Sequence, residues 1–282
     1  MTFSEKLDSN MIEKFVYLPK LMGMKVIEQS GGVIVDTNIP CDMFNIVCCP
    51  KSTLDVESVY NYFSSRNLPF AFWTGFNDEY SDFQKDMEKI GFSCDETETG
   101  MAVSASELDR ESDFEISCDK LEIKFVSSAE LLRDFIAVYK NLIPDDASAI
   151  NEFYTKSAPF ILDSNSALKL FVGFYEGMPV ATSALFLQDD VAGVWDVTTL
   201  PKFRRKGIGT DMTVHALKYA KDLYNCEVGV LTASSDGESV YRKLGFKKIK
   251  EFRIANVSVK QSKSRNIDRF LFSPKTLCRE KR

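Results

Sequence analysis

Residues 197–210 constrain the fold of this chain more than any other segment. An apolar stretch runs to Leu200 and is followed by a basic turn that contains Gly207 and Gly209. Beyond the turn, apolar residues recur at helical spacing, Val214 and Leu217 among them. This order predicts a buried strand, a glycine turn and an amphipathic helix. Because glycine has no Cβ, such a turn and the N-terminus of the helix can bring backbone N–H groups close to a phosphate.

The spacing of the basic turn separates it from two common phosphate-binding loops. The turn has neither the G-x-G-x-x-G pattern of dinucleotide-binding folds nor the G-x-x-x-x-G-K-[ST] pattern of P-loops. It reads R-x-x-G-x-G instead, with Arg204 three residues before Gly207. An ordinary glycine turn with solvated basic side chains has the same appearance, so the residues downstream must distinguish the two interpretations.

The residues downstream continue a regular α/β order. Residues 228–233 are an apolar run typical of a buried strand, residues 234–237 are polar, and residues 238–244 predict a short helix. Gly245 is suited to cap the C-terminus of this helix. Tyr241 stands four residues before Gly245, which is followed by Phe246.

The basic turn and the tyrosine motif, in this order and spacing, resemble the GNAT superfamily of N-acetyltransferases. The resemblance implies an α/β fold with a mixed sheet, the acyl-CoA N-acyltransferase fold, and acetyl-CoA as co-substrate. It assigns cofactor contacts to Val197, Thr198, Thr199, Arg204, Arg205, Lys206, Gly207, Ile208, Gly209 and Thr210. Ser234 stands where the family often has a cofactor-contacting asparagine, and its hydroxyl is a substitute for that group.

The same resemblance implies the catalytic residues. Tyr241 is expected to be the general acid that protonates the departing thiolate, since a phenol with a pKa near ~10 carries a proton at neutral pH. A packing role for this aromatic side chain is the alternative. Asp196, on the strand that leads to the turn, is the first candidate for the general base and Glu152 is a second. Many members of the superfamily need no single dedicated base.

The chain contains the same pattern twice. Residues 44–51 and 195–202 are both apolar strands that end at Pro-Lys, and each is followed by a helical pattern and a second strand. The first copy lacks the residues expected for phosphate binding and for acid catalysis, because residues 51–55 contain no glycine and Met87 stands in the position of the tyrosine. We therefore expect two tandem GNAT-like domains, a degenerate one at 1–110 and a catalytic one at 121–282 that ends in a basic tail. Two unrelated α/β segments with a short likeness are the alternative. The charged residues 108–115 are interpreted as the linker.

Charge and composition bear on the binding partners, the metal content and the location of the protein. Residues 1–110 carry 18 acidic and 9 basic side chains, which disfavours non-specific nucleic-acid binding, whereas the remainder has a net charge of +3. The seven cysteines show no CxxC spacing and His215 is the only histidine, so we expect no metal site and a reducing compartment. Without a signal-like N-terminus or an apolar run of ~20 residues, we expect a cytoplasmic protein without membrane contact.

These observations leave two classes of function. The first is an acetyl-CoA-dependent N-acetyltransferase that moves the acetyl group from the thioester to a primary amine, either a small molecule or a protein. The second is a non-catalytic acyl-CoA-binding or protein-interaction module built on the same scaffold. The sequence sets no oligomeric state.

Overall fold

The computed structural model describes residues 1–29, 32–49, 54–75, 96–110 and 118–257 of the 282-residue chain. The first half contains α1 (Phe3–Leu21), β1 (Lys25–Gln29), β2 (Gly32–Asp36), β3 (Ile46–Cys49), α2 (Val56–Ser64), β4 (Phe70–Thr74), β5 (Glu96–Ser104) and α4 (Ala105–Arg110). The second half contains β6 (Leu121–Phe125), α5 (Ala129–Leu142), the 3-10 helix η2 (Pro144–Asp146), α6 (Ala147–Ile161), β7 (Leu168–Tyr175), β8 (Met178–Gln188), β9 (Val191–Thr199), the 3-10 helix η3 (Pro201–Phe203), α7 (Ile208–Tyr224), β10 (Val228–Ala233), α8 (Glu238–Lys243) and β11 (Lys247–Val257).

The same strand topology occurs in both halves. In the first half β1, β2 and β3 are antiparallel neighbours, and β4 returns parallel to β3 after α2. In the second half β7, β8 and β9 are antiparallel neighbours, and β10 returns parallel to β9 after α7. The predicted repeat is therefore present as a repeated architecture, and the mixed α/β sheet expected from the sequence is confirmed.

The two halves exchange strands within one sheet. The described strands form an 11-stranded sheet in the order β1-β2-β3-β4-β11-β5-β10-β9-β8-β7-β6. β5 of the first half lies between β10 and β11, and β11 of the second half lies between β4 and β5. The predicted division at 1–110 and 121–282 stays a prediction, but each part completes the sheet of the other.

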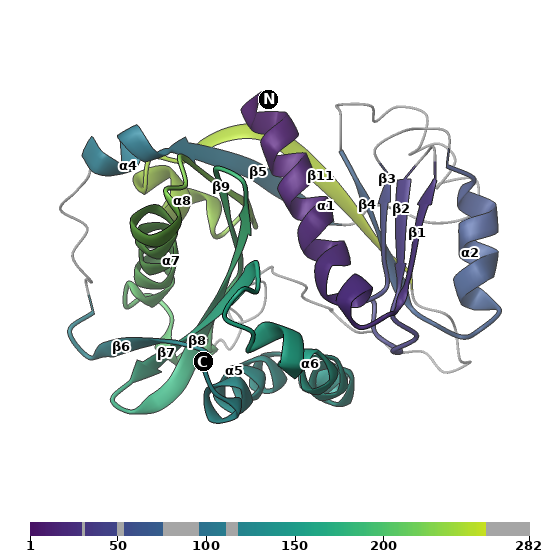
Figure 1. The fold of residues 1–282 in the computed structure, drawn as a ribbon, viewed down its shortest axis with the longest axis horizontal. Coiled ribbons are helices and arrows are strands. Elements are labelled where there is room, and N and C mark those ends of the chain that lie inside the picture. The colour runs from purple at the N-terminus through teal and green to yellow at the C-terminus, as the bar shows by residue number, and fades with distance from the viewer. Residues whose placement is uncertain (30–31, 50–53, 76–95, 111–117, 258–282) are drawn as a thin grey trace, which may run out of the picture.

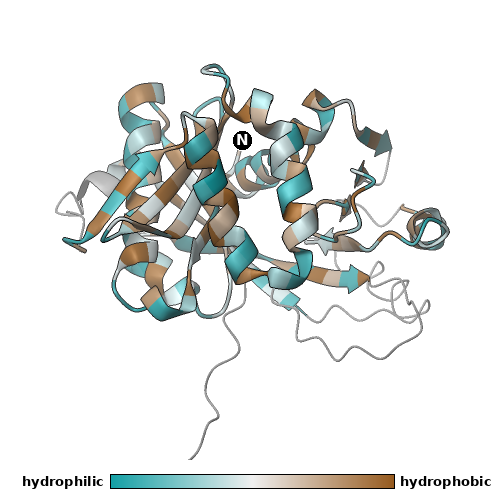
Figure 2. Cartoon of the chain, turned by 90° about the horizontal axis from the view of Figure 1, so that it is seen from below, coloured by the Kyte–Doolittle hydropathy of each residue, from teal (hydrophilic) through white to brown (hydrophobic). Residues whose placement is uncertain are grey.

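The sheet bends around α1, and helices cover both of its faces (Figure 1). One apolar core joins α1, α5 and α6 to the inner face of the sheet. A second core packs α7 on the outer face of β7–β10, and a third packs α2 on the outer face of β2–β4. Hydrophilic and hydrophobic residues alternate around the helices (Figure 2), as expected for helices with one buried face.

Helix α1, which the sequence analysis did not predict, holds the two halves together. It begins with a capping box between Thr2 and Glu5. Asn10 is fully buried, accepts a hydrogen bond from Nε1 of Trp195 on β9 at 3.0 Å, and donates one to the carbonyl of Phe186 on β8 at 3.3 Å. Because α1 approaches β9 this closely, a Cβ on Gly193 would lie 1.9 Å from Oδ1 of Asn10.

Several local predictions are confirmed and one is wrong. Ser128 caps α5 by accepting a hydrogen bond from the backbone N–H of Leu131 at 3.3 Å, and the β7–β8 hairpin turns at Glu176 and Gly177 as expected. The linker prediction fails at residues 108–110, which belong to α4, because helix formation there needs no apolar periodicity. The predicted helix before residue 92, the possible strand at 270–272 and the basic tail lie outside the described residues. Among the described residues, no helix has the length and apolar content that a membrane crossing requires.

Candidate functional site

The glycine turn leaves the N-terminus of α7 open. Arg205 and Gly207 have φ angles of 60° and 81°, both in the left-handed region, so the chain turns sharply between them. Gly207 is the N-cap of α7 and provides no side-chain hydrogen bond, and the helical ladder starts with the N–H of Asp211 donating to the Gly207 carbonyl at 3.0 Å. The N–H groups of the first turn, at residues 208–210, therefore precede the ladder and point out of the helix end. This geometry suits an anion.

Basic side chains surround this helix end. Nε of Arg204 donates to the backbone carbonyl of Thr199 at 3.1 Å, which fixes the turn to the end of β9. Nζ of Lys206 lies 4.9 Å from the ring centre of Tyr175, and Arg205 is exposed. Among the described atoms, a Cβ on Gly209 would meet only Oγ1 of Thr199, at 3.9 Å, so the space over this glycine is open. All the residues predicted for the pyrophosphate contact thus lie around one helix end.

β9 and β10 separate just below this turn. Their parallel pairing is confined to residues 191–193 of β9 and 228–230 of β10. Beyond that point β9 continues to Thr199 with β8 as its described partner, and its register with β8 shifts near Asp196, whose φ is 54°. The backbone of Val197, Thr198 and Thr199 consequently has a free edge on the β10 side, as far as the described strands extend. These three residues are among those to which the family resemblance assigns cofactor contacts, and those contacts stay a prediction.

The described part of the first copy is closed at the corresponding place. Every residue of β3 pairs with β4, from Ile46 opposite Ala71 to Cys49 opposite Thr74. The N-cap of α2 is Asp55, whose carboxylate accepts a hydrogen bond from the backbone N–H of Ser58 at 3.0 Å. The carboxylate occupies the place at this helix end where a phosphate would bind, and its negative charge would repel the phosphate. The corresponding loop residues 51–53 and Met87 lie outside the described residues.

Tyr241 lies beside the opening, close to α7. Its hydroxyl and the hydroxyl of Thr213 are hydrogen bonded to one another, and Thr213 in turn donates to the Gly209 carbonyl at 2.9 Å. Burial and the nearby Glu98 carboxylate raise the pKa of Tyr241 to about 12. The phenol is therefore a neutral proton donor over the physiological range.

Asp196 is engaged with α1. Both of its carboxylate oxygens lie 3.1 Å from Nζ of Lys14, and its backbone carbonyl accepts a hydrogen bond from the Thr182 hydroxyl at 3.2 Å. Tyr139 donates to the same carbonyl at 3.4 Å. Glu152, the second candidate base, pairs with Lys156 on the exposed side of α6.

Ser234 is used within its own turn. Its hydroxyl accepts a hydrogen bond from the N–H of Gly237 at 3.3 Å, and its carbonyl accepts from the same group at 3.0 Å. This side chain stabilises the entry to α8, and a cofactor contact by Ser234 stays a prediction.

Glu98 is a functional candidate that the sequence analysis missed. It lies on β5, is 5% exposed, and accepts a hydrogen bond from the Thr232 side chain. Burial, assisted by the carboxylates of Glu96 and Asp196, raises the pKa of Glu98 to about 7. Burial thus raises both pKa values: that of Glu98 to about 7, where its carboxylate can accept a proton near neutral pH, and that of Tyr241 to about 12, where the phenol keeps its proton.

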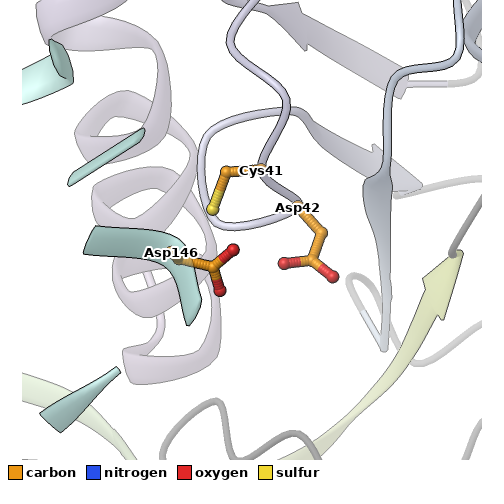
Figure 3. A group of neighbouring side chains, drawn as sticks. All are labelled: Cys41, Asp42 and Asp146. Carbon is orange, nitrogen blue, oxygen red and sulfur yellow. The ribbon is translucent and has the colours of Figure 1, made fainter. Parts of the chain in front are cut away.

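A cavity between the two halves reaches Glu98. It has a volume of about 100 Å³ and is open to solvent. Glu98 and Asp196 line it together with residues of α1, β3, β4, α5 and α6. Asp42 lines it as well, and its carboxylate lies within 4.8 Å of ligand atoms of Cys41 and Asp146 (Figure 3). Each of these three buried side chains interacts with other groups of the protein, so the cluster gives no argument for a bound ion.

Comparisons with known proteins find a family pattern in the second half of the chain. Residues 132–246 match the model of the acetyltransferase (GNAT) family. A 63-residue stretch, 21% of the chain, is 36% identical to an N-alpha-acetyltransferase of Sulfurisphaera tokodaii and spans 38% of that protein's length. Residues 132–246 therefore carry the sequence pattern of the acetyltransferase (GNAT) family.

Solved structures extend the likeness to nearly the whole chain. A GCN5-related N-acetyltransferase from Kribbella flavida superposes with a TM-score of 0.62 at 15% identity, over 91% of this chain and 96% of that chain. A tandem GNAT protein from the clavulanic acid biosynthesis pathway superposes with a TM-score of 0.52 at 8% identity, over 92% and 97%. At these identities the likeness establishes the fold, including its tandem form.

Proposed function

We propose that the protein is an acetyl-CoA-dependent N-acetyltransferase that transfers the acetyl group to a primary amine by direct attack on the thioester. One observation carries the proposal: the free edge of β9 leads through the glycine turn to the open N-terminus of α7, and Tyr241 is hydrogen bonded to Thr213 of the same helix. The pairing of β3 and β4 and the carboxylate cap on α2 support a single such site, in the second half.

Different residues of the second half bind, align and protonate different parts of the co-substrate. The N–H groups at the start of α7 and the basic side chains around them bind the pyrophosphate. The free backbone edge at Val197, Thr198 and Thr199 aligns the pantetheine arm as an added strand would. Tyr241 donates its proton to the sulfur when the carbon–sulfur bond breaks, which avoids the release of a bare thiolate. Asp196, the first candidate for the general base, forms an ion pair with Lys14, and its role as the base stays a prediction.

Two measurements test the proposal. Calorimetry with acetyl-CoA is expected to show one site per chain, and a free-thiol assay over a panel of amines is expected to show turnover that depends on the amine. The panel includes peptides with a free N-terminus, because the matched relative is an N-alpha-acetyltransferase. Acetyl-CoA binding without turnover on any amine would favour the alternative, a non-catalytic acyl-CoA-binding module. No binding of acetyl-CoA would refute both.

A further inference from the structure

The lining of the cavity between the halves has two different ends. Glu98 and Asp196 give one part of the lining an acidic character, and the Glu98 carboxylate also helps to raise the pKa of Tyr241, which lies outside the lining. Among the described residues of the lining, Lys14 is the only cation, and it is already paired with Asp196. Elsewhere the lining contains one further carboxylate, Asp42, which already interacts with other groups of the protein. The rest is mainly apolar, with six aromatic side chains: Phe15, Phe44, Trp73, Tyr139, Phe153 and Tyr154.

The aromatic side chains form fixed walls. Phe44 of the first half stacks on Phe153 of the second with ring centres 4.1 Å apart and planes 9° apart. Phe15 of α1 packs on Trp73 of β4 with ring centres 5.5 Å apart. The walls therefore come from both halves, and their order lowers the entropy cost of holding an apolar ligand.

We propose that this cavity is the acceptor site and that it selects a small primary amine with one positive charge and an apolar, aromatic or alkyl body, whose ammonium group gives its proton to Glu98. The inference rests on the proposed function and names its acceptor class. The carboxylates at one end and the nearby ring faces both attract a cation. The apolar walls then favour an uncharged body over a chain of further ammonium groups or a hydrated peptide.

The proposed step balances in atoms and charge. The bound ammonium transfers one proton to the Glu98 carboxylate, and the resulting amine lone pair forms the carbon–nitrogen bond at the thioester carbonyl. When the carbon–sulfur bond breaks, the sulfur takes the proton of Tyr241. The phenolate then regains a proton from the new amide nitrogen, so the products are the amide, the free thiol and one proton on Glu98 for release to water.

The fluorescence of Trp73 is expected to report amine binding in the absence of turnover. The chain contains two tryptophans, and the other, Trp195, is 6% exposed and bonded to Asn10. We expect 2-phenylethylamine and hexylamine to change the fluorescence of the protein and the Trp73→Phe variant to lose that change. The neutral analogue 2-phenylethanol, the polycation spermidine and a short peptide with a free N-terminus should bind at least 10-fold more weakly. Equal binding of the neutral analogue, or preferred binding of spermidine or the peptide, would overturn the acceptor class.

Glu98→Gln tests the proton acceptor. We expect kcat with 2-phenylethylamine to fall by about 10²- to 10⁴-fold, the rise in rate near pH 7 to be lost, and acetyl-CoA affinity to stay unchanged. The charged groups that act on Glu98 are Glu96, Asp196 and Lys14, and the neutral phenol of Tyr241 is the further titratable group that interacts with it; all four remain in this variant. Glu57→Gln, on the exposed side of α2, is the matched control and should behave as wild type. An unchanged pH profile in Glu98→Gln would refute the role.

Different results would refute the acceptor inference and the proposed function. If acetyl-CoA binds and some amine is acetylated, but the monoamines leave the Trp73 signal unchanged, the acceptor inference is wrong and the proposed function stands. If acetyl-CoA does not bind, the proposed function itself is wrong. Should Glu98→Gln melt far below wild type, Phe153→Ala gives an independent test, because it should weaken monoamine binding at least 10-fold with acetyl-CoA affinity unchanged.

Discussion

Gly209→Ala separates the role of the glycine turn in binding from its role in folding. Gly209 is the second residue of α7, and the one described atom near a Cβ placed there is Oγ1 of Thr199, at the ordinary contact distance of 3.9 Å. The apo protein therefore accommodates alanine without rearrangement. In a helix alanine is favoured over glycine by up to about 1 kcal/mol. We accordingly expect the variant to be as stable as wild type or slightly more stable.

Acetyl-CoA binding should respond in the opposite direction. If the pyrophosphate approaches the N–H groups at the start of α7 at hydrogen-bond distance, about 2.9 Å, the added methyl group enters the space of a phosphate oxygen. We expect at least a 10-fold weaker Kd, which corresponds to about 1.4 kcal/mol. Calorimetry with acetyl-CoA and thermal melting measure the two effects separately.

Gly177→Ala provides the control for glycine substitution as such. Gly177 has a φ of 83° in the β7–β8 hairpin, and no described atom lies within 4 Å of the place that its Cβ would take. Alanine therefore costs backbone strain at this position without touching the site. The variant should have a lower melting temperature and unchanged acetyl-CoA affinity. Unchanged acetyl-CoA affinity in Gly209→Ala would refute the close approach of the phosphate and with it the proposed binding mode.

Three further predictions concern the residues around this opening. Tyr241→Phe should lower turnover by about 10²- to 10⁴-fold with acetyl-CoA affinity nearly unchanged, whereas unaltered turnover would exclude the general-acid role. The pKa of Glu98 is raised from 4.5 to about 7 in the folded state, so the folded protein binds this proton more tightly than the unfolded chain does. The resulting contribution to stability is complete below pH 4.5 and is lost as the pH rises through 7. The melting temperature of wild type should therefore fall over this pH range relative to that of Glu98→Gln. Gly193→Ala should destabilise the fold by more than about 2 kcal/mol, because its Cβ would collide with the side chains of Asn10 and Trp195 and break the hydrogen bond between them. A urea midpoint equal to that of wild type would contradict that packing.

Local signals in the sequence were sufficient for part of this site. The glycine turn, the start of α7 and the cap at Ser128 depend on residues close together in the chain, so their chemistry is visible without a fold. Glu98 shows the limit of such reasoning. It belongs to the polar run Glu96-Thr97-Glu98-Thr99, which in isolation is typical of a solvated edge strand. Its burial arises because β5 lies between β10 and β11 and beneath α1, and only long-range pairing creates that environment.

The two proposals together give the first half a role that does not require it to bind the co-substrate. Its β3 and β4 stay paired to their ends, so these two strands leave no opening for a pantetheine arm. Yet it contributes Glu98 from β5, Lys14 from α1 and Trp73 from β4 to the cavity beside the opening in the second half. If the cavity is the acceptor site that we propose, the first half is needed for acceptor binding even though the second half alone binds the co-substrate.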